Sequence, residues 1–432
     1  MHRRGWDALR ALGGVRGARG YGCRQLRRHV RALSASAVEP MRRTSQDLGA
    51  TIAMDTSARP AKPLLEWMKR GDPDLVPVML ADPHSTTASY FGVSARAEGQ
   101  SASFTDLPQS PITPEMVLQC CRETGIQLVC PLGGATHLDV IGFLDDVETT
   151  VQEEMAVNGD LIKRTAIRTP AGELADVFVT PAGRPAYWAE HLVRGPADLP
   201  ALTHLIERVA QASLEDDRVR DRLTAKFRAE AMRWPAETLF KVSLGVPTFV
   251  LASMLYMAHE TFCYLLADHV AAMERLYEAL EQATLVWLEC AAAAGADITM
   301  GAINGLELFS PRIYRRYFIP QARRLHEAAH THGMLGWVHT CGHMRSLIET
   351  GVYDEMAVDV LESLASPPLG TVADLRSARQ RLGNRIVTRG AVNVNYFYLD
   401  FEQRYDVKRL GPSSPTNGCE GSGSRRRNNL AV

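Results

Sequence analysis

The sequence lacks a long apolar run and any excess of charge of one sign. Its longest uninterrupted apolar candidate, Val246 to Tyr256, is too short to span a bilayer. The 48 basic and 49 acidic residues leave a formal net charge of -1. Such a chain has no overall field that would attract nucleic acid. We therefore expect neither a membrane span nor a nucleic-acid partner.

The sequence also lacks the cysteine spacing of a disulfide scaffold, with eight cysteines in 432 residues. Most of them fall in apolar stretches and are predicted to be small buried side chains. This prediction covers Cys120, Cys121, Cys130, Cys263 and Cys290. Cys341 and Cys419 lie outside such stretches and are candidates for chemistry.

The first 45 residues contain no lysine, eleven arginines and only two acidic residues. This composition is typical of an organelle transit peptide and predicts a mitochondrial or plastid protein. The alternative is a chain that begins at Met41 or Met54 and stays in the cytoplasm. The predicted organisation is a disordered leader over 1–55, a catalytic domain over 56–410 and an irregular tail over 411–432.

From Leu199 onward, helical patterns alternate with short apolar runs. This alternation indicates a parallel sheet with right-handed crossovers. With two earlier strands the count approaches eight, which favours a (β/α)8 TIM barrel over an open sheet. An alternating segment, Lys163 to Thr180, predicts a β-hairpin insertion. The predicted strands are Val76–Leu80, Ile126–Cys130, Pro247–Leu251, Asp297–Met300, Met334–His339, Met356–Val360 and Arg385–Thr388; the helices are Lys62–Arg70, Pro114–Glu123, Leu202–Ala229, Ala267–Ala294, Pro311–His332, Met344–Thr350 and Val372–Leu382.

The strand Met334–His339 leads directly into His339-Thr340-Cys341-Gly342. Side chains two residues apart on a strand share a face, so His339 and Cys341 point the same way. In a barrel, the chemistry lies at the ends of the strands where these residues fall. An imidazole and a thiolate together suit zinc. The alternative is a buried histidine beside a buried cysteine, with no metal.

Several further motifs occur in a fixed order along the chain. Together they resemble the uroporphyrinogen decarboxylase superfamily over most of residues 60–395. The resemblance implies a TIM barrel, which in this superfamily is often a homodimer. The motifs are Gly295-Ala296-Asp297, Leu308-Phe309-Ser310-Pro311, Tyr317-Phe318, His339-Thr340-Cys341-Gly342, Glu362-Ser363-Leu364, Pro367-Pro368, Leu382-Gly383-Asn384-Arg385 and Gly390-Ala391-Val392-Asn393.

The superfamily contains decarboxylases and methyltransferases. The lack of an arginine-rich stretch in this sequence helps to choose between them. True uroporphyrinogen decarboxylases have an arginine-rich stretch after the first strand, whose guanidinium groups bind the carboxylates of the substrate. At the matching place this chain reads Val76 to Ser85 and has no arginine before Arg96. The sequence therefore disfavours the decarboxylase of porphyrin biosynthesis, which stays the alternative function.

The other branch is similar to the zinc-dependent corrinoid methyltransferases. The resemblance implies that His339, Cys341 and Cys419 bind zinc, which would hold a thiol acceptor as the thiolate that attacks a cobalt-bound methyl group. The corrinoid is expected on a separate protein, because no Asp-x-His-x-x-Gly motif is present. The sequence after Cys419 departs from the family pattern. Cys419 has an alternative interpretation as a free cysteine in a disordered tail. For the whole chain, a non-catalytic relic that kept the barrel is a third interpretation.

Four further residues follow predicted strands and are candidate site residues. His84 is a candidate for both catalysis and substrate binding, and Glu307 is a candidate catalytic carboxylate. Asn393 and Glu362 are candidate substrate-binding residues. Glu362 is also a candidate to orient His339 or to cap a helix. By contrast, Asp297 is expected to pack or cap, and His326, His330 and His332 are expected to be solvated.

Overall fold

A computed structural model describes residues 62–70, 79, 87, 90–91, 112–181, 186–244, 252–304, 309–367, 370–383, 385–390 and 430–431. These residues fall into two compact units. Those between 79 and 128 form one unit, and residues 62–70 with those from 129 onward form the other.

In the first unit, helix α5 (Pro114–Thr124) confirms the prediction for this segment. Its first turn is capped by Thr113, whose side chain accepts a hydrogen bond from the backbone N–H of Met116 at 3.3 Å. The helix ends at Gly125, which takes a left-handed conformation with φ of 76°. Beyond it, Gln127 pairs in parallel with Met79. Two of the predicted early strands are therefore neighbours.

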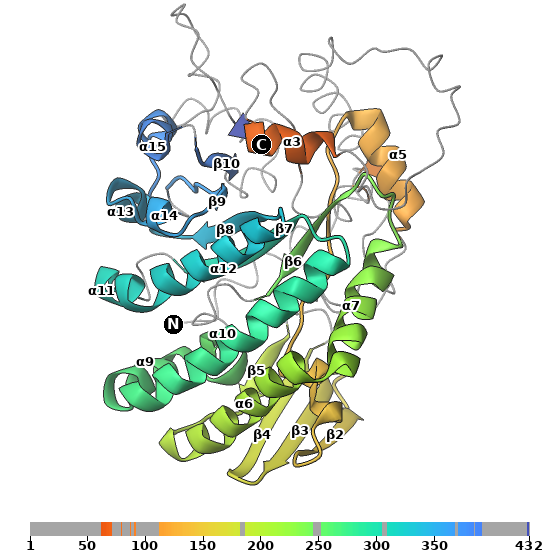
Figure 1. Cartoon of the computed structure of the whole chain (residues 1–432), viewed down its shortest axis with the longest axis vertical. Helices are drawn as coiled ribbons and strands as arrows, with labels where there is room; N and C mark the ends of the chain where they lie inside the picture. Colours follow the sequence, from red (N-terminus) through yellow and green to blue (C-terminus); the bar gives the residue numbers. More distant parts are fainter. Residues whose placement is uncertain are drawn as a thin grey trace, which may run out of the picture. The chain divides into compact units, whose positions relative to one another are not determined.

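The second unit is built on a curled parallel sheet (Figure 1). Every neighbouring pair in it is parallel, as helix–strand alternation requires. This confirms the predicted α/β class, and the described strands form a half-barrel consistent with a TIM-like fold. The strands, in their order across the sheet, are β1 (Val129–Pro131), β6 (Leu239–Ser243), β7 (Ile298–Asn304), β8 (Leu335–Cys341), β9 (Val360–Ser363), β10 (Val387–Gly390) and β11 (Leu430–Ala431).

Helices connect these strands, as predicted, with short 3-10 and π turns among them. The α-helices of this unit are α3 (Pro63–Arg70), α6 (Leu199–Glu215), α7 (Asp217–Ala231), α9 (His259–Asp268), α10 (Val270–Ala293), α11 (Pro311–Ile313), α12 (Ile319–Thr331), α13 (Arg345–Glu349), α14 (Val352–Glu355) and α15 (Leu375–Leu382). The 3-10 helices are η4 (His137–Asp139), η5 (Ile141–Phe143) and η6 (Pro196–Asp198), and the π-helical turns are η7 (Ala252–Tyr256) and η8 (Tyr314–Phe318).

Some predicted boundaries are wrong. The single helix expected over Leu202–Ala229 is two helices, because Asp216 leaves the helical conformation and caps α7 through the N–H of Arg218 at 2.9 Å. Strand β6 was not predicted, and the strand expected at Pro247–Leu251 lies outside the described residues. Strand β9 begins at Val360 rather than Met356, because Ala357 has a positive φ of 54° and belongs to a turn.

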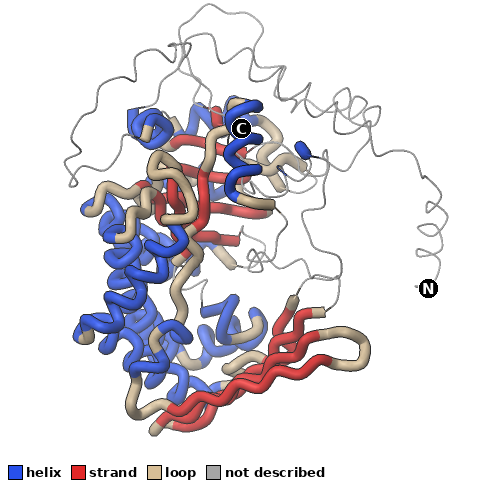
Figure 2. Tube along the Cα trace, turned by 90° about the vertical axis from the view of Figure 1, so that its right-hand side faces the viewer, coloured by secondary structure: helices blue, strands red, loops and turns tan. Residues whose placement is uncertain are grey.

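The predicted hairpin is the centre of an antiparallel sheet of four strands (Figure 2). Strands β3 (Leu161–Thr169) and β4 (Gly172–Thr180) form the hairpin, and β2 (Glu148–Met155) and β5 (Tyr187–Glu190) extend it. Helix α6 contacts β3 and β4, where Ile167 and Leu174 are buried. Strand β2 is an edge strand that is exposed along its whole length. The hairpin is therefore an insertion that packs on the helical layer.

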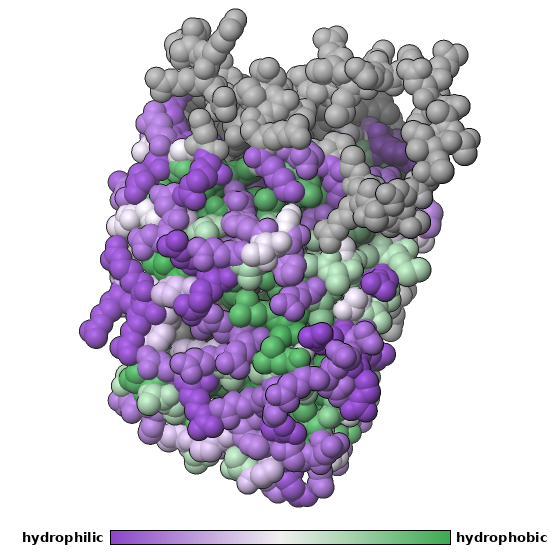
Figure 3. All heavy atoms as spheres, viewed as in Figure 1, coloured by the Kyte–Doolittle hydropathy of each residue, from purple (hydrophilic) through white to green (hydrophobic). Residues whose placement is uncertain are grey.

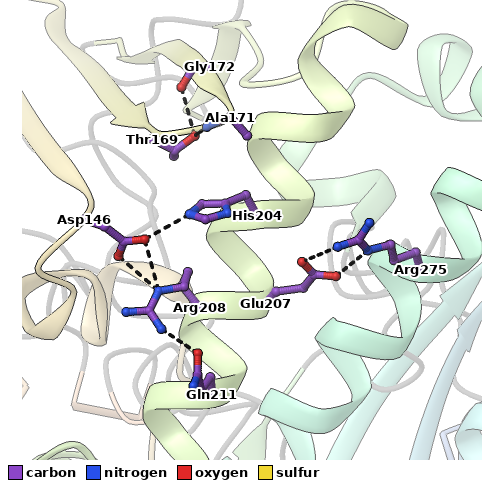
Figure 4. A network of polar contacts seen from close by, with 9 residues as sticks. All are labelled: Asp146, Thr169, Ala171, Gly172, His204, Glu207, Arg208, Gln211 and Arg275. Carbon is purple, nitrogen blue, oxygen red and sulfur yellow. Dashed lines mark hydrogen bonds and ion pairs between the residues drawn. The ribbon is translucent and has the colours of Figure 1, made fainter.

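One carboxylate ties this insertion to α6 (Figure 4). Asp146, just before β2, accepts hydrogen bonds from Nε of Arg208 at 3.0 Å and from Nε2 of His204 at 3.1 Å. Burial raises the pKa of Asp146, but the hydrogen bonds from Arg208 and His204 outweigh it, so the pKa is lowered. On the same helix, Glu207 pairs with Arg275 of α10. Helix α6 therefore anchors the insertion on one side and α10 on the other.

Hydrophilic residues cover most of the described surface on the face in Figure 3. Ion pairs between neighbouring helices also contribute charged side chains to the surface of the described residues. Arg324 of α12 pairs with Glu281 of α10, and Arg316 pairs with Glu274 at 2.7 Å. Such exposed pairs add little stability. Within the described residues, no helix is long and apolar enough to cross a membrane.

Candidate functional site

The side chains of β8 alternate between the two faces of the sheet. Gly336 faces α12, because a β-carbon at this glycine would lie 2.6 Å from the ring of His326. Val338 lies two residues after Gly336 and shares its face. Trp337 and His339 lie on the opposite face, away from α12. Trp337 is 1% exposed, and the His339 side chain, near the strand's C-terminal end, is 31% exposed. His339 therefore lies where barrel enzymes place their chemistry.

The strand register sets His339, Glu362 and Arg389 in one row across the sheet. His339 of β8 is level with Glu362 of β9, which is level with Arg389 of β10. Residues that are level on neighbouring parallel strands point to the same face. The row therefore carries an imidazole, a carboxylate and a guanidinium side by side on three successive strands.

The carboxylate of Glu362 is the centre of this row. Its Oε1 lies 2.6 Å from Nη1 of Arg389 and 3.6 Å from Nδ1 of His339, and its Oε2 accepts a hydrogen bond from Nε1 of Trp337 at 2.7 Å. The guanidinium of Arg389 also lies over the Trp337 ring, 5.2 Å from its centroid. Both oxygens of Glu362 therefore have fixed partners.

Two opposing influences act on the pKa of Glu362. Burial raises it, but the contact with His339 and the positive charges of Arg389 and Lys241 lower it more, to about 2. Glu362 is therefore a carboxylate at physiological pH. Because its negative charge is balanced by Arg389, the row keeps a charged acceptor next to the imidazole of His339.

The backbone is strained where β9 ends. Ser363 has a φ of 97° and Leu364 a φ of 42°, values that side chains other than glycine rarely adopt. This conformation accompanies a contact of 3.3 Å between Oγ of Ser363 and Nδ1 of His339. Beside it, a β-carbon on Gly390 would lie 2.7 Å from the carbonyl oxygen of Ser363. The end of β10 therefore needs glycine to approach β9 this closely.

Several predicted site residues lie outside the described residues. These are His84, Glu307, Asn393 and Cys419. The backbone of Cys341 ends β8, but its side chain also lies outside the described part. Of the predicted set, the structure thus brings together His339 and Glu362 alone. Among the described residues, no group of three histidine, cysteine or acidic side chains is placed to hold a metal ion.

The sequence reasoning missed Arg389 and Trp337, which hold Glu362. Arg389 is the one charged residue of a short strand. It follows Ile386-Val387-Thr388 and directly precedes Gly390. A buried charge in a strand requires a partner, so this pattern was a usable signal. Nothing local in the sequence indicated that the partner is Glu362 on the neighbouring strand.

Two other expectations concerned residues away from this row. Asp297 is buried at the start of β7, where it pairs with Lys62 at 2.6 Å and accepts from the N–H of Phe240 at 2.8 Å, so it packs as expected. The solvated environment predicted for His326 is wrong. Its ring is buried between α12 and β8, and its Nδ1 lies 2.8 Å from the carbonyl oxygen of Met356.

The chain was compared with family models, with solved structures and with curated proteins, and the family model bears on the motif-based resemblance. Residues 224–405 match the family model for uroporphyrinogen decarboxylase (URO-D), which confirms the resemblance over that range. Among solved structures, the chain is similar to a methyltransferase from Methanosarcina mazei at 13% sequence identity and a TM-score of 0.44. That similarity covers 76% of this chain and 81% of the other. Comparison with curated proteins finds no match.

Proposed function

We propose that this chain, whose residues 224–405 match the URO-D family, is an enzyme of the methyltransferase type rather than a decarboxylase. The observation that carries the proposal is the position of His339 at the C-terminal end of β8, with Nδ1 facing Ser363 and Glu362. A carboxylate or hydroxyl beside one ring nitrogen is the usual arrangement of a histidine that binds a metal or a substrate through its other nitrogen.

In its finer form, the proposal is that His339, Cys341 and Cys419 hold zinc. One nitrogen and two sulfur donors are a chemically suitable set for this ion, and the contact of His339 with a carboxylate is typical of zinc-binding histidines. When bound, zinc would supply a site at which an acceptor thiol is held as thiolate. The methyl donor would be a corrinoid carried by a separate protein.

The chain's own residues have defined tasks in this proposal. Glu362 and Ser363 orient His339, and Arg389 keeps Glu362 in place. Trp337 fills the interior below the row and is 1% exposed, which excludes water from that side. These residues position the reacting groups but do not take part in bond formation.

One observation weighs against decarboxylation of an octacarboxylate. In the described strands of the parallel sheet, Arg389 is the one arginine. Its side chain is 6% exposed and paired with Glu362. A guanidinium engaged in this way is not available to clamp substrate carboxylates.

The test starts with the zinc content of the purified full-length chain, measured by elemental analysis. We expect one zinc per chain in the wild type and its loss in His339→Ala and Cys341→Ser. The matched control is His332→Ala, since His332 is an exposed histidine at the end of α12. A metal-free wild type, or variants that bind as much zinc as the wild type, would contradict the zinc site.

Activity is then measured with methylcobalamin and a small thiol, following loss of the cobalt-bound methyl group by absorbance. Thiol methylation that requires His339 supports the proposal. Anaerobic conversion of uroporphyrinogen to coproporphyrinogen would favour the decarboxylase instead. Absence of both reactions, together with absence of zinc, would favour a non-catalytic relic.

A further inference from the structure

Strand β2 forms one margin of the antiparallel sheet (Figure 1). Its eight residues, Glu148–Met155, are all exposed, and all of them pair with β3 without a shift of register. The other margin differs, because β5 has four residues and its pairing with β4 shifts between Val177 and Phe178. Short or irregular edge strands resist pairing with another chain, whereas a long regular one presents a row of unpaired backbone groups. Of the two margins, β2 is therefore the one suited to accept a further strand.

The charged side chains of β2 give this edge little protection. An edge that repels a second strand usually carries lysine, proline or a charge that points inward. Strand β2 contains neither lysine nor proline, and each of its glutamates is neutralised by a basic residue of β3. The ion pairs are Glu148 with Arg168 at 3.1 Å, Glu153 with Lys163 at 3.8 Å and Glu154 with Arg164 at 3.0 Å.

Apolar side chains are exposed along the same edge. Val151 is 47% exposed and Met155 is 67% exposed, and Val157, in the turn after β2, is fully exposed. Val151 and Met155 lie four residues apart on the strand and therefore share one face. A strand placed beside β2 would remove part of this apolar surface from water.

Pairing of β2 with β2 of a second copy has a register that avoids opposed like charges. A two-fold axis perpendicular to the sheet makes the two strands antiparallel and sets residues of the same face opposite each other. The registers that keep all but one residue of each strand paired are centred on Val151 and on Gln152. The first sets Glu148 opposite the partner's Glu154, which is unfavourable. The second sets Thr150 there instead, and no acidic residue lies opposite another.

We propose that β2 pairs with β2 of a second copy of this chain, antiparallel and centred on Gln152, so that the two antiparallel sheets become one sheet across a dimer. The inference is independent of the proposed function, because it concerns the insertion and not the end of β8. A pair of short edge strands buries less than the roughly 1,200 to 2,000 Å² of stable interfaces. The dimer is therefore expected to dissociate on dilution.

The first measurement is the mass of the full-length chain in a dilution series, by analytical ultracentrifugation. We expect a monomer–dimer equilibrium. Gln152→Lys sets two lysines opposite each other in the dimer and should weaken association about 10-fold. The matched control is Gln380→Lys, which changes an exposed glutamine of α15 and should associate like the wild type. Because both glutamines are exposed, both variants should keep the wild-type circular dichroism.

The second measurement tests the register by cross-linking. Residues directly opposite on antiparallel strands have Cα atoms about 4.5 to 5.5 Å apart, a distance that a disulfide can span. Gln152→Cys should therefore form a covalent dimer under mild oxidation, and a reductant should separate it. The control is Thr150→Cys, whose two copies would lie about 13 Å apart along the strands. The wild type measures the background from the chain's own cysteines.

Three results would overturn the inference. One is a wild type that stays monomeric at every concentration. Another is a dimer that Gln152→Lys does not weaken relative to Gln380→Lys. The third is a dimer in which Gln152→Cys cross-links no faster than Thr150→Cys. None of these results bears on zinc content or methyl transfer, so failure of the dimer and failure of the proposed function remain distinguishable.

Discussion

The ring of His326 occupies the space in which a β-carbon on Gly336 would lie, with its Cγ only 2.6 Å from that position. Helix α12 and strand β8 therefore approach each other at a glycine. The first prediction is that Gly336→Ala lowers the free energy of unfolding by about 1 to 3 kcal/mol, because a buried ring must shift to admit the methyl group. Urea unfolding measures the change.

The control for this substitution is Gly142→Ala, since a β-carbon at Gly142 meets no atom within 4 Å. It should have little effect on stability. An equal loss in both variants would indicate that close packing against His326 is not the cause.

The second prediction concerns the pH dependence of stability. Burial lowers the pKa of His326 to about 4, and that of His137 also to about 4. The unfolded chain binds a proton at each residue near pH 6.5, so stability falls as the pH drops from about 6.5 toward 4. Each histidine should cost about 2 kcal/mol at pH 5 relative to pH 7.5. His326→Gln should remove about half of this combined dependence.

Urea unfolding at the two pH values checks the second prediction, with the exposed His332→Gln as control. The control should retain the wild-type slope of stability against pH. If His326→Gln retains it as well, His326 is already charged in the folded chain or solvated there.

The third prediction concerns the buried pair of Lys62 and Asp297. Lys62→Met removes the cation that lies 2.6 Å from the buried carboxylate of Asp297, which should lower the free energy of unfolding by about 3 to 5 kcal/mol. Adding Asp297→Asn should restore much of the loss, because the amide oxygen can still accept from the N–H of Phe240. Lys69→Met, which breaks an exposed pair with Glu66, should cost about 1 kcal/mol or less.

The measurement is again chemical denaturation, with the single and double variants compared in one cycle. A double variant as unstable as Lys62→Met would show that the loss of the Lys62 charge beside Asp297 is not what destabilises the chain.

The fourth prediction concerns the anchor of the antiparallel sheet. Asp146→Ala removes the acceptor shared by His204 and Arg208 and should lower the free energy of unfolding by about 1 to 3 kcal/mol. Hydrogen exchange should accelerate in β2 and β3 before it does in β8. The neighbouring exposed Asp145→Ala is the control. Equal exchange rates in wild type and Asp146→Ala would show that packing on α6 is sufficient to hold the sheet.

Much of the fold was predictable because long helices have a strong periodic signal. Helix α10 and the hairpin around Thr169 to Gly172 lie close to where their patterns place them. Short strands carry little such signal. Strand β6 has only five residues and was missed, and the break at Asp216 depends on a single capping side chain within an otherwise helical pattern.

The site was predictable only in part, and for a related reason. The end of β8 follows from local sequence, so His339 could be assigned to it. The partners of Glu362 depend on which residues are level across β8, β9 and β10, and this register is a property of the whole sheet. Periodicity within one segment contains no information about it. Arg389 was therefore not recognised as a partner, and the predicted strand Arg385–Thr388 ended one residue before it.

The row formed by His339, Glu362 and Arg389 makes the site sensitive to changes in length rather than composition. Successive residues of a strand face opposite sides, so an insertion or deletion of one residue between β8 and β9 that shifted the pairing would bring Leu361 or Ser363 level with His339. The backbone ladder would still form and the hydrophobic content would be unchanged. The charge next to the imidazole would nevertheless be gone. Among homologous chains, insertions and deletions near β9 should therefore lie in the loops outside the paired residues. They should not shift the pairing of β9 with β8.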